Sequence, residues 1–221
     1  MNHSDTSPQR ILLFGGTFDP PHRAHVELPQ LAAEKLQCDR IVYIPAAINP
    51  LKRDTPPTDD EHRLNMLRLA IQDLSNAEIS TIELQRGGAS YFVETVQAMR
   101  QRFGEDADIR FLIGADSAAE FHKWKNWQHI LELATPVVML RPPWDRDALR
   151  AALREVHPPA LVEQWMSWLI DLPMRDISAT EIRQRMHTGN RLAELLDPKV
   201  IEYIYEHHLY MERSATGRDA K

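Results

Sequence analysis

Short apolar runs alternate along this chain with longer segments whose apolar residues recur three and four positions apart. The runs are mostly apolar without interruption, which is typical of strands buried on both faces of a sheet. They span 11–14, 40–44, 109–113 and 136–140. The longer segments indicate helices with one buried side, and they span 23–36, 90–103, 127–134 and 145–157. This alternation predicts an α/β protein with a Rossmann-like, doubly wound parallel sheet and helices on both faces.

The last part of the chain adds helices that no strand follows. Residues 180–187 have helical spacing, and Gly189 is placed as a terminator. Asp197 and Pro198 are typical of the cap and first turn of a final helix. We therefore expect a C-terminal helical part that belongs to the same domain.

Three other segments carry weaker patterns. Residues 79–84 alternate as a strand does, and residues 161–172 fit either a helix or a strand, with a strand favoured over 168–172. Thr58 and Glu61 have the spacing of a capping box, which predicts a helix that begins there.

Length and charge limit the kind of protein. A chain of 221 residues suits one domain, which we expect over 9–212, with 1–8 and 213–221 as loose tails. The formal charge of −6 predicts no nucleic-acid partner, and the single Cys38 excludes an internal disulfide. No apolar run reaches membrane-spanning length, so we expect a cytoplasmic protein with no membrane partner. A homo-oligomer stays open.

Candidate chemistry begins directly after the first apolar run. Gly15 and Gly16 open a turn in which backbone can approach a phosphate without a Cβ in the way. Thr17-Phe18-Asp19-Pro20 follows, and then His22 and His25, whose spacing lets both rings face one side of a helix start. An ordinary strand-to-helix turn and a zinc site are the alternatives, and the zinc site is weaker because no third ligand is obvious.

A second segment with similar chemistry lies far along the chain, at Ile177-Ser178-Ala179-Thr180-x-x-Arg183. The hydroxyls could merely cap a helix, and Arg183 could be a surface charge. Together, hydroxyl, guanidinium and the free N–H groups of a helix start are suited to phosphate. Two such segments on one small domain suggest a nucleoside triphosphate that is cleaved between them.

These two motifs closely resemble those of the nucleotidyltransferase family with the His-x-x-His signature. The segments 90–95 and 111–117, with Trp124 and Trp127, resemble the bacterial nicotinate mononucleotide adenylyltransferases in particular. The resemblance runs from about Arg10 to Tyr210. It implies adenylyl transfer from ATP to nicotinate mononucleotide in NAD biosynthesis, with deamido-NAD and pyrophosphate as products. It also implies Mg²⁺ bound mainly through the ATP phosphates, with no metal ligated by the protein itself.

The resemblance also implies roles for individual residues. Catalytic roles fall to His22, His25 and Arg183. Contacts to ATP fall to Gly15, Gly16, Thr17, Phe18, His22, His25, Ile177, Ser178, Thr180 and Arg183. Contacts to the mononucleotide fall to Thr17, Lys52, Ser90, Tyr91, Gly114, Asp116 and Trp124. The chain departs from the family at Ala24, where glycine is usual, and at Phe92, where threonine is usual.

Other interpretations of the same residues remain open. Without the resemblance, Trp124 would most often be a core or partly buried residue. Asp116 is then equally well explained as a turn residue and as a ribose contact. Arg141, before Pro142, matches a family Arg-Pro or is purely structural. A pantetheine-phosphate adenylyltransferase would share the first motif and the reaction. A class I tRNA synthetase core would need a tRNA-binding domain for which the chain has no room, and a nucleotide sensor would bind without turnover.

Overall fold

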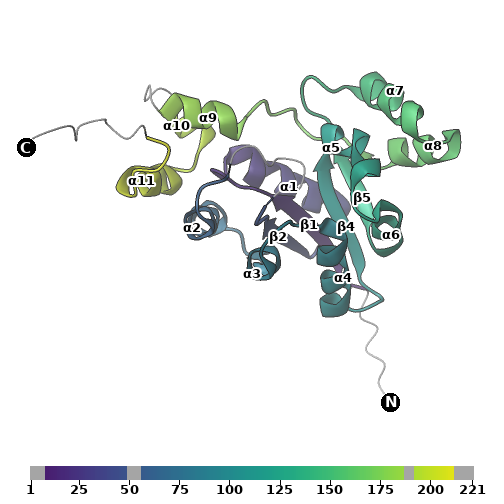
Figure 1. The fold of residues 1–221 in the computed structure, drawn as a ribbon, viewed down its shortest axis with the longest axis horizontal. Helices are drawn as coiled ribbons and strands as arrows, with labels where there is room; N and C mark the ends of the chain where they lie inside the picture. Colours follow the sequence, from purple (N-terminus) through teal and green to yellow (C-terminus); the bar gives the residue numbers. More distant parts are fainter. Residues whose placement is uncertain (1–7, 49–55, 187–191, 212–221) are drawn as a thin grey trace, which may run out of the picture.

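The computed structural model describes residues 8–48, 56–186 and 192–211. Its centre is a sheet of six strands, all paired in parallel, in the order β3-β2-β1-β4-β5-β6 (Figure 1). The strands are β1 Arg10–Gly16, β2 Arg40–Pro45, β3 Ala77–Ile79, β4 Asp108–Gly114, β5 Thr135–Met139 and β6 Leu169–Ile170. The chain starts in the middle of the sheet, builds outward to one edge, and then returns to build the other half. This order is that of a Rossmann-like fold and confirms the predicted architecture.

Helices fill most of the connections between the strands. They are α1 Arg23–Leu36, α2 Asp60–Ile71, α3 Ile82–Arg86, α4 Phe92–Phe103, α5 Ala115–Ala119, α6 Trp127–Leu133, α7 Arg146–Val156, α8 Pro159–Ser167, α9 Ala179–Met186, α10 Leu192–Leu195 and α11 Pro198–Glu206. A short 3₁₀ turn spans Phe121–Lys123.

Both faces of the sheet are buried, as the continuous apolar runs predict. Ile11 and Leu13 of β1 face a core that α4, α5, α6, α7 and α8 close. Leu12 and Phe14, which alternate with them, face a second core that α1 and α2 close. Period-two alternation in an all-apolar strand therefore supplies two cores at once.

The C-terminal helices have a small core of their own. Met66 of α2 packs there with Ile182 of α9 and with Val200 and Ile204 of α11, all buried. Figure 1 shows α9, α10 and α11 grouped beside α2, at one side of the sheet. This confirms the predicted helical part and makes α2 the element that joins it to the sheet.

Three weaker assignments turn out differently. The strand predicted over 79–84 ends at Ile79, and Ile82–Arg86 forms α3, because Ile82 and the buried Glu83 pack inward on one short turn. Residues 159–167 form α8, and only Leu169 and Ile170 of the predicted strand pair with β5. Asp59, not Thr58, precedes α2, and no side chain caps it; the Thr58 carbonyl accepts instead from Arg63.

The described residues bear only in part on the predicted extent of the domain. In the described part of the chain no helix is both long and apolar enough to cross a membrane. Gly189 and most of both predicted tails lie outside the described residues. The single-domain extent of 9–212 stays a prediction.

Candidate active site

The two candidate phosphate motifs meet at Asp19. Arg183, on the second turn of α9, donates from Nη1 to the Asp19 carbonyl oxygen at 2.6 Å. Its other terminal nitrogen, Nη2, lies 3.3 Å from Oγ1 of Thr180. Segments more than 150 residues apart in sequence therefore share one site, at the point where the chain leaves β1 for α1.

The turn after β1 is shaped by Gly16 and Phe18. A Cβ on Gly16 would come within 3.0 Å of the Phe18 ring, so a side chain there would push the ring aside. Phe18 itself is 1 % exposed and has a positive φ of 52°, which is unusual for a bulky residue. The buried ring fixes the turn in this strained conformation, while Gly15, Gly16 and Thr17 keep exposed surface.

His22 and His25 form a stacked pair at the start of α1. Their ring centroids are 3.6 Å apart and the ring planes differ by 19°. Nδ1 of His25 accepts from the backbone N–H of His22 at 3.2 Å. Since Nδ1 is an acceptor, the proton of neutral His25 is on Nε2. Phe14 and Phe18 pack against the His25 ring and hold its orientation.

Both histidines are neutral in the free protein at neutral pH. Burial, assisted by the Arg141 guanidinium, lowers the pKa of His22 to about 4. For His25, loss of hydration is the largest cause, and His22 and Arg141 add to it, so that its pKa lies well below the usual value. His25 as a whole residue is only partly exposed, and the surrounding protein removes most of the water from its ring. The Nδ1 atom of His22 has no partner among the described residues.

Arg141 and Asp116 form an ion pair at the carboxyl ends of β4 and β5. Arg141 donates from Nη2 to Oδ2 of Asp116 at 2.6 Å and from Nε to Oδ1 at 3.2 Å. The pair lies over Gly114, where a Cβ would be 2.4 Å from Oδ1 of Asp116. Arg141 also reaches His22 and His25 electrostatically, so it belongs to the same sheet edge as the histidines. The carboxyl edge of a parallel sheet is where doubly wound proteins bind ligands.

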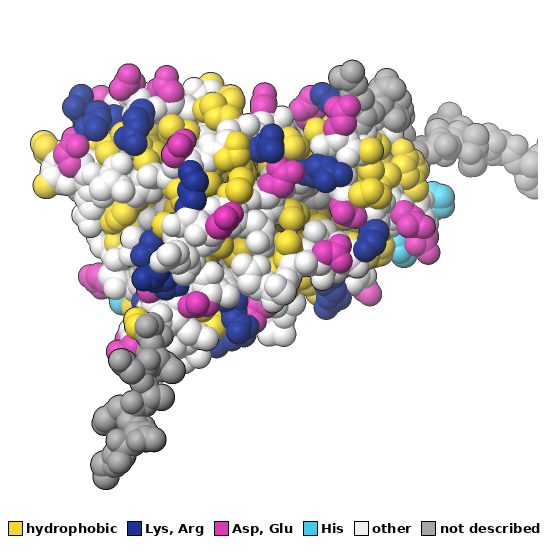
Figure 2. All heavy atoms as spheres, turned by 180° about the vertical axis from the view of Figure 1, so that it is seen from behind, with side chains coloured by type: hydrophobic (Ala, Val, Ile, Leu, Met, Phe, Trp, Pro, Cys, Tyr) yellow, Lys and Arg dark blue, Asp and Glu magenta, His cyan; other side chains and the backbone are white. Residues whose placement is uncertain are grey.

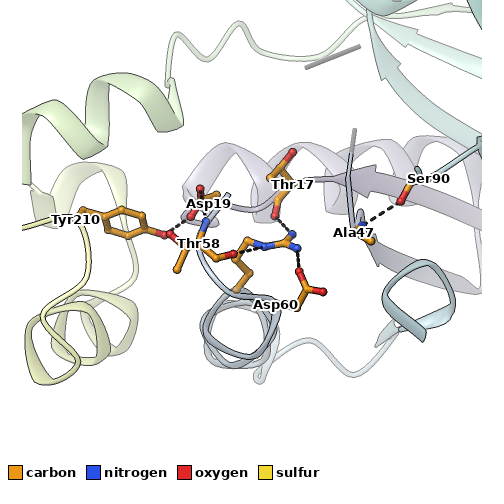
Figure 3. A network of polar contacts seen from close by, with 8 residues as sticks. Thr17, Asp19, Ala47, Thr58, Asp60, Ser90 and Tyr210 are labelled. Atoms are coloured by element: carbon orange, nitrogen blue, oxygen red, sulfur yellow. Dashed lines mark hydrogen bonds and ion pairs between the residues drawn. The ribbon is translucent and has the colours of Figure 1, made fainter. Parts of the chain in front are cut away.

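Ser90 has a position that sequence reasoning did not anticipate. Its Oγ accepts from the backbone N–H of Ala47 at 3.0 Å and hydrogen-bonds the buried Glu83. Glu83 also accepts from Oγ1 of Thr95 at 2.6 Å. The Ser90 hydroxyl thus ties the chain that follows β2 to the start of α4 (Figure 3). Its assignment as a mononucleotide contact stays a prediction.

The aromatic residues near α4 are partly buried. Trp124 packs on Phe92 and Phe121, with ring centroids 5.4 Å and 4.8 Å away, and its Nε1 has no partner among the described residues. Tyr91 directly precedes α4, and Nζ of Lys125 lies 4.1 Å from the centroid of its ring. The backbone N–H groups of Ser90 and Tyr91 already donate to Ile48 and Ala89. The next N–H groups, at the start of α4, lack acceptors within their own helix.

The rest of the predicted site is placed as follows. Ile177 packs against the C-terminal core, and Ser178, which directly precedes α9, is exposed. Lys52 lies outside the described residues. No group of three or more acidic, histidine or cysteine side chains suited to a metal is found within 8–48, 56–186 and 192–211.

Sequence reasoning missed two residues beside the first motif. Arg63 is fully buried and donates from Nη1 to the Thr17 carbonyl at 2.7 Å, and it also contacts Asp60. Tyr210 donates its hydroxyl to Oδ1 of Asp19 at 2.6 Å. The spacing of Arg63 from Met66 and Leu67 puts it on the apolar side of α2, which was a usable signal. No sequence pattern indicated Tyr210, because it lies near the polar C-terminal end of the chain.

Comparison with known proteins gives a consistent result. The model of the family described as cytidylyltransferase-like matches residues 13–185. A "Probable nicotinate-nucleotide adenylyltransferase" of Bordetella avium is 40% identical over 91% of this chain and 98% of its own length. One of the same description from Prosthecochloris aestuarii is 37% identical over 93% of this chain and 100% of its own length. A Plasmodium falciparum nicotinic acid mononucleotide adenylyltransferase, solved in complex with NaAD, has a TM-score of 0.72 at 17% identity, covering 91% of this chain and 97% of its own.

Proposed function

Since this chain belongs to the nicotinate-nucleotide adenylyltransferases, within the cytidylyltransferase-like family, we propose that it transfers the adenylyl group of ATP to nicotinate mononucleotide. The products are deamido-NAD and pyrophosphate, and the reaction belongs to NAD biosynthesis. The observation that carries the proposal is the contact between Arg183 and the Asp19 carbonyl, because it joins both phosphate motifs in one site. A triphosphate held by both would have its reactive phosphorus between them.

The reaction needs little proton chemistry from the protein. An oxygen of the mononucleotide 5′-phosphate attacks the α-phosphorus of ATP, and the bond from that phosphorus to the bridging oxygen of the β-phosphate breaks. The nucleophile is already an anion, so no general base and no covalent intermediate are required. The protein then accelerates the step by positioning the two substrates and by stabilising the charge that moves to pyrophosphate.

His25 and Arg183 supply hydrogen-bond donors that would stabilise that negative charge. The hydrogen bond at Nδ1 leaves the Nε2–H of His25 as a donor of fixed orientation. The guanidinium of Arg183 is held in position by two oxygen acceptors, the carbonyl of Asp19 and the hydroxyl of Thr180. Donors that are oriented before the substrate arrives cost no reorganisation during the reaction.

The residues at the two motifs are compatible with a Mg²⁺ ion that is bound mainly by the substrate's phosphates. Among the residues assigned to the two motifs, Asp19 carries the one carboxylate, and it is occupied by Tyr210 and by the Thr58 N–H, while His22, His25 and Arg183 present nitrogen. Mg²⁺ prefers oxygen ligands and keeps several waters, so phosphate oxygens and water would hold it, and its chemistry is to neutralise phosphate charge.

The nicotinate ring is proposed to bind beside Tyr91 and Trp124. The first N–H groups of α4 favour an anionic carboxylate, since a helix start carries partial positive charge. An amide in place of the carboxylate would turn an N–H toward those donors and leave one unpaired, which costs about 1–3 kcal/mol. Selection of nicotinate over nicotinamide mononucleotide would then need no cationic side chain.

The absence of a nucleic-acid partner, the cellular location and the oligomeric state stay predictions. Acidic and basic side chains are interspersed on the face that Figure 2 shows, so this face has no continuous basic surface for nucleic acid. Cytoplasmic location and a homo-oligomeric state are tested by fractionation and by light scattering.

A panel of acceptors tests the function directly. Purified protein with ATP and Mg²⁺ is given nicotinate mononucleotide, nicotinamide mononucleotide and phosphopantetheine, and pyrophosphate release is measured together with the adenylylated product. We expect kcat/KM for nicotinate mononucleotide to exceed that for the nicotinamide form by roughly five- to 150-fold, the factor that one unpaired donor gives. Turnover of phosphopantetheine alone would assign the pantetheine branch, and ATP binding without pyrophosphate release would assign a sensor.

A further inference from the structure

Asp19 is contacted by three segments that are distant in sequence. Tyr210 donates its hydroxyl to Oδ1 at 2.6 Å, and the backbone N–H of Thr58 donates to Oδ2 at 3.2 Å. Arg183 donates to the carbonyl oxygen at 2.6 Å. The residue is 8 % exposed, and Figure 3 shows Tyr210 and Thr58 converging on it. Asp19 is therefore a junction in which both the carboxylate and the main chain are held.

Two of these contacts come from the same C-terminal unit. Tyr210 packs against the small core of Met66, Val200 and Ile204, to which α9 contributes Ile182. Arg183 is the next residue of α9. Tyr210 and Arg183 thus extend from one packed group of helices to two atoms of one residue, three positions before His22.

The chemistry of Tyr210 suits a permanent donor. Burial, followed by the charge of Asp19, raises the pKa of the Tyr210 hydroxyl well above its usual value. The hydroxyl therefore keeps its proton at neutral pH, and the contact is an O–H donating to a carboxylate. Hydrogen bonds to an ionised acceptor are shorter and stronger than neutral ones.

We propose that Tyr210 is a positioning residue for ATP: by fixing the Asp19 carboxylate it sets the carbonyl on which the Arg183 guanidinium rests. Tyr210 touches no substrate in this arrangement. It aligns the C-terminal helices, which carry the second phosphate motif, on the first motif. The inference rests on the proposed function where it concerns kcat/KM, but the effect on the Kd of ATP can be measured without turnover.

Tyr210→Phe is the variant that removes this hydroxyl and keeps the ring. The Asp19 carboxylate then keeps only one of its two donors, the backbone N–H of Thr58. The carbonyl of Asp19, on which Arg183 rests, is no longer fixed in position. We expect a roughly five- to tenfold weaker Kd for ATP and an equal loss of kcat/KM for ATP, less than a direct charged hydrogen bond would give because the effect is transmitted. The KM of the mononucleotide stays within about twofold.

Two matched tyrosines separate this role from general docking. Tyr205→Phe removes an exposed hydroxyl from α11, and we expect no change. Tyr203→Phe removes the contacts of its hydroxyl with His62 and Asn65 of α2, at 3.0 Å and 3.1 Å, and so loosens the same helices without touching Asp19. Losses in ATP affinity as large for Tyr203→Phe as for Tyr210→Phe would overturn the proposal.

A double-mutant cycle provides the closing test. In an Arg183→Ala background, Tyr210→Phe should cost no further ATP affinity, because the group it positions is gone. Additive losses, or an unchanged Kd in the single variant, would refute the role of Tyr210. If Tyr210→Phe fails to fold, Asp19→Asn weakens the same contact from the other side and enters the same cycle. Calorimetry with ATP alone measures these effects even if the wild-type protein makes no deamido-NAD, so failure of the proposed function stays distinguishable.

Discussion

The rings of His22 and His25 lie face to face, 3.6 Å apart at their centroids, and the backbone N–H of His22 donates to Nδ1 of His25. This one bond fixes the tautomer of His25 and leaves its Nε2–H as a donor. His22 supports that arrangement in two ways, since its backbone orients His25 and its ring covers one face of it. The pair is therefore a single preorganised unit and not two independent side chains.

His25→Ala removes the oriented donor. We expect kcat to fall ~10²–10³-fold, the usual cost of losing one donor to developing charge, while the KM of the mononucleotide changes little. Steady-state kinetics on protein of verified fold measure both values. His129→Ala is the control, because His129 is a partly exposed histidine on α6 that pairs with Glu132. A kcat within a few-fold of wild type would remove His25 from the catalytic groups.

Stability of the free protein should depend on pH through His22. Its pKa is lowered to about 4 in the folded state, so between pH 6.5 and 4 the unfolded chain binds more protons. The contribution is therefore complete above about pH 6.5 and is lost as the pH falls through this window. We expect about 2 kcal/mol less unfolding free energy at pH 5 than at pH 7 from this group.

Urea unfolding of wild type and His22→Gln at both pH values isolates this contribution. The drop in unfolding free energy between pH 7 and 5 should be smaller in the variant by at least about that amount. The substitution also removes the charge of His22 from His25, while groups away from His22 titrate equally in both proteins. An identical drop would show that His22 is not neutralised by burial.

Gly114→Ala tests the Asp116–Arg141 pair. The new methyl would lie 2.4 Å from Oδ1 of Asp116, so the carboxylate must move. The backbone at Gly114 has φ −76°, which alanine adopts freely, so little stability is lost. We expect the KM of the mononucleotide to rise roughly tenfold, as for one lost charged hydrogen bond. In an Asp116→Ala background the same change should have no effect, and an equal rise there would show a steric effect on the ligand itself.

Fold and site differ in how far the sequence determines them. Apolar runs such as 11–14 indicate strands, because both faces of a doubly wound sheet are buried and because the run is short and ends at Gly15 and Gly16, which favours a strand over a buried helix. The segment at Ile82–Arg86 failed because its alternation also fits one helical turn, and burial of Glu83 decides between them. Local patterns do not contain that information.

For the site, the motifs indicated which residues gather but not what holds them. Arg63 and Tyr210 contact the first motif through a carbonyl and a carboxylate across long sequence separations. Ser90 was expected to contact the ligand, but its hydroxyl is hydrogen-bonded within the protein, to Ala47 and Glu83. Helical spacing indicated that Arg63 is buried, but not which atom it contacts. Such long-range hydrogen bonds depend on the folded path of the chain, which local patterns do not give.

Arg183 should act on ATP and not on the acceptor. Its guanidinium reaches both Asp19 and Thr180, a geometry that needs two separate nitrogens. We expect Arg183→Ala to weaken ATP binding roughly tenfold or more, the cost of a lost charge-assisted hydrogen bond, with mononucleotide affinity within about twofold. Arg183→Lys keeps the charge but cannot span both acceptors, so it should recover only part of the loss.

Calorimetric titration of each substrate separates these outcomes. Arg185→Ala is the control, since Arg185 is on the same helix but pairs with Glu181. Full recovery of ATP affinity in Arg183→Lys would mean that charge alone matters and that the two-acceptor geometry does not. Equal losses for ATP and mononucleotide would mean instead that Arg183 maintains the fold of the site, because a residue that holds only the triphosphate has no reason to change affinity for the acceptor.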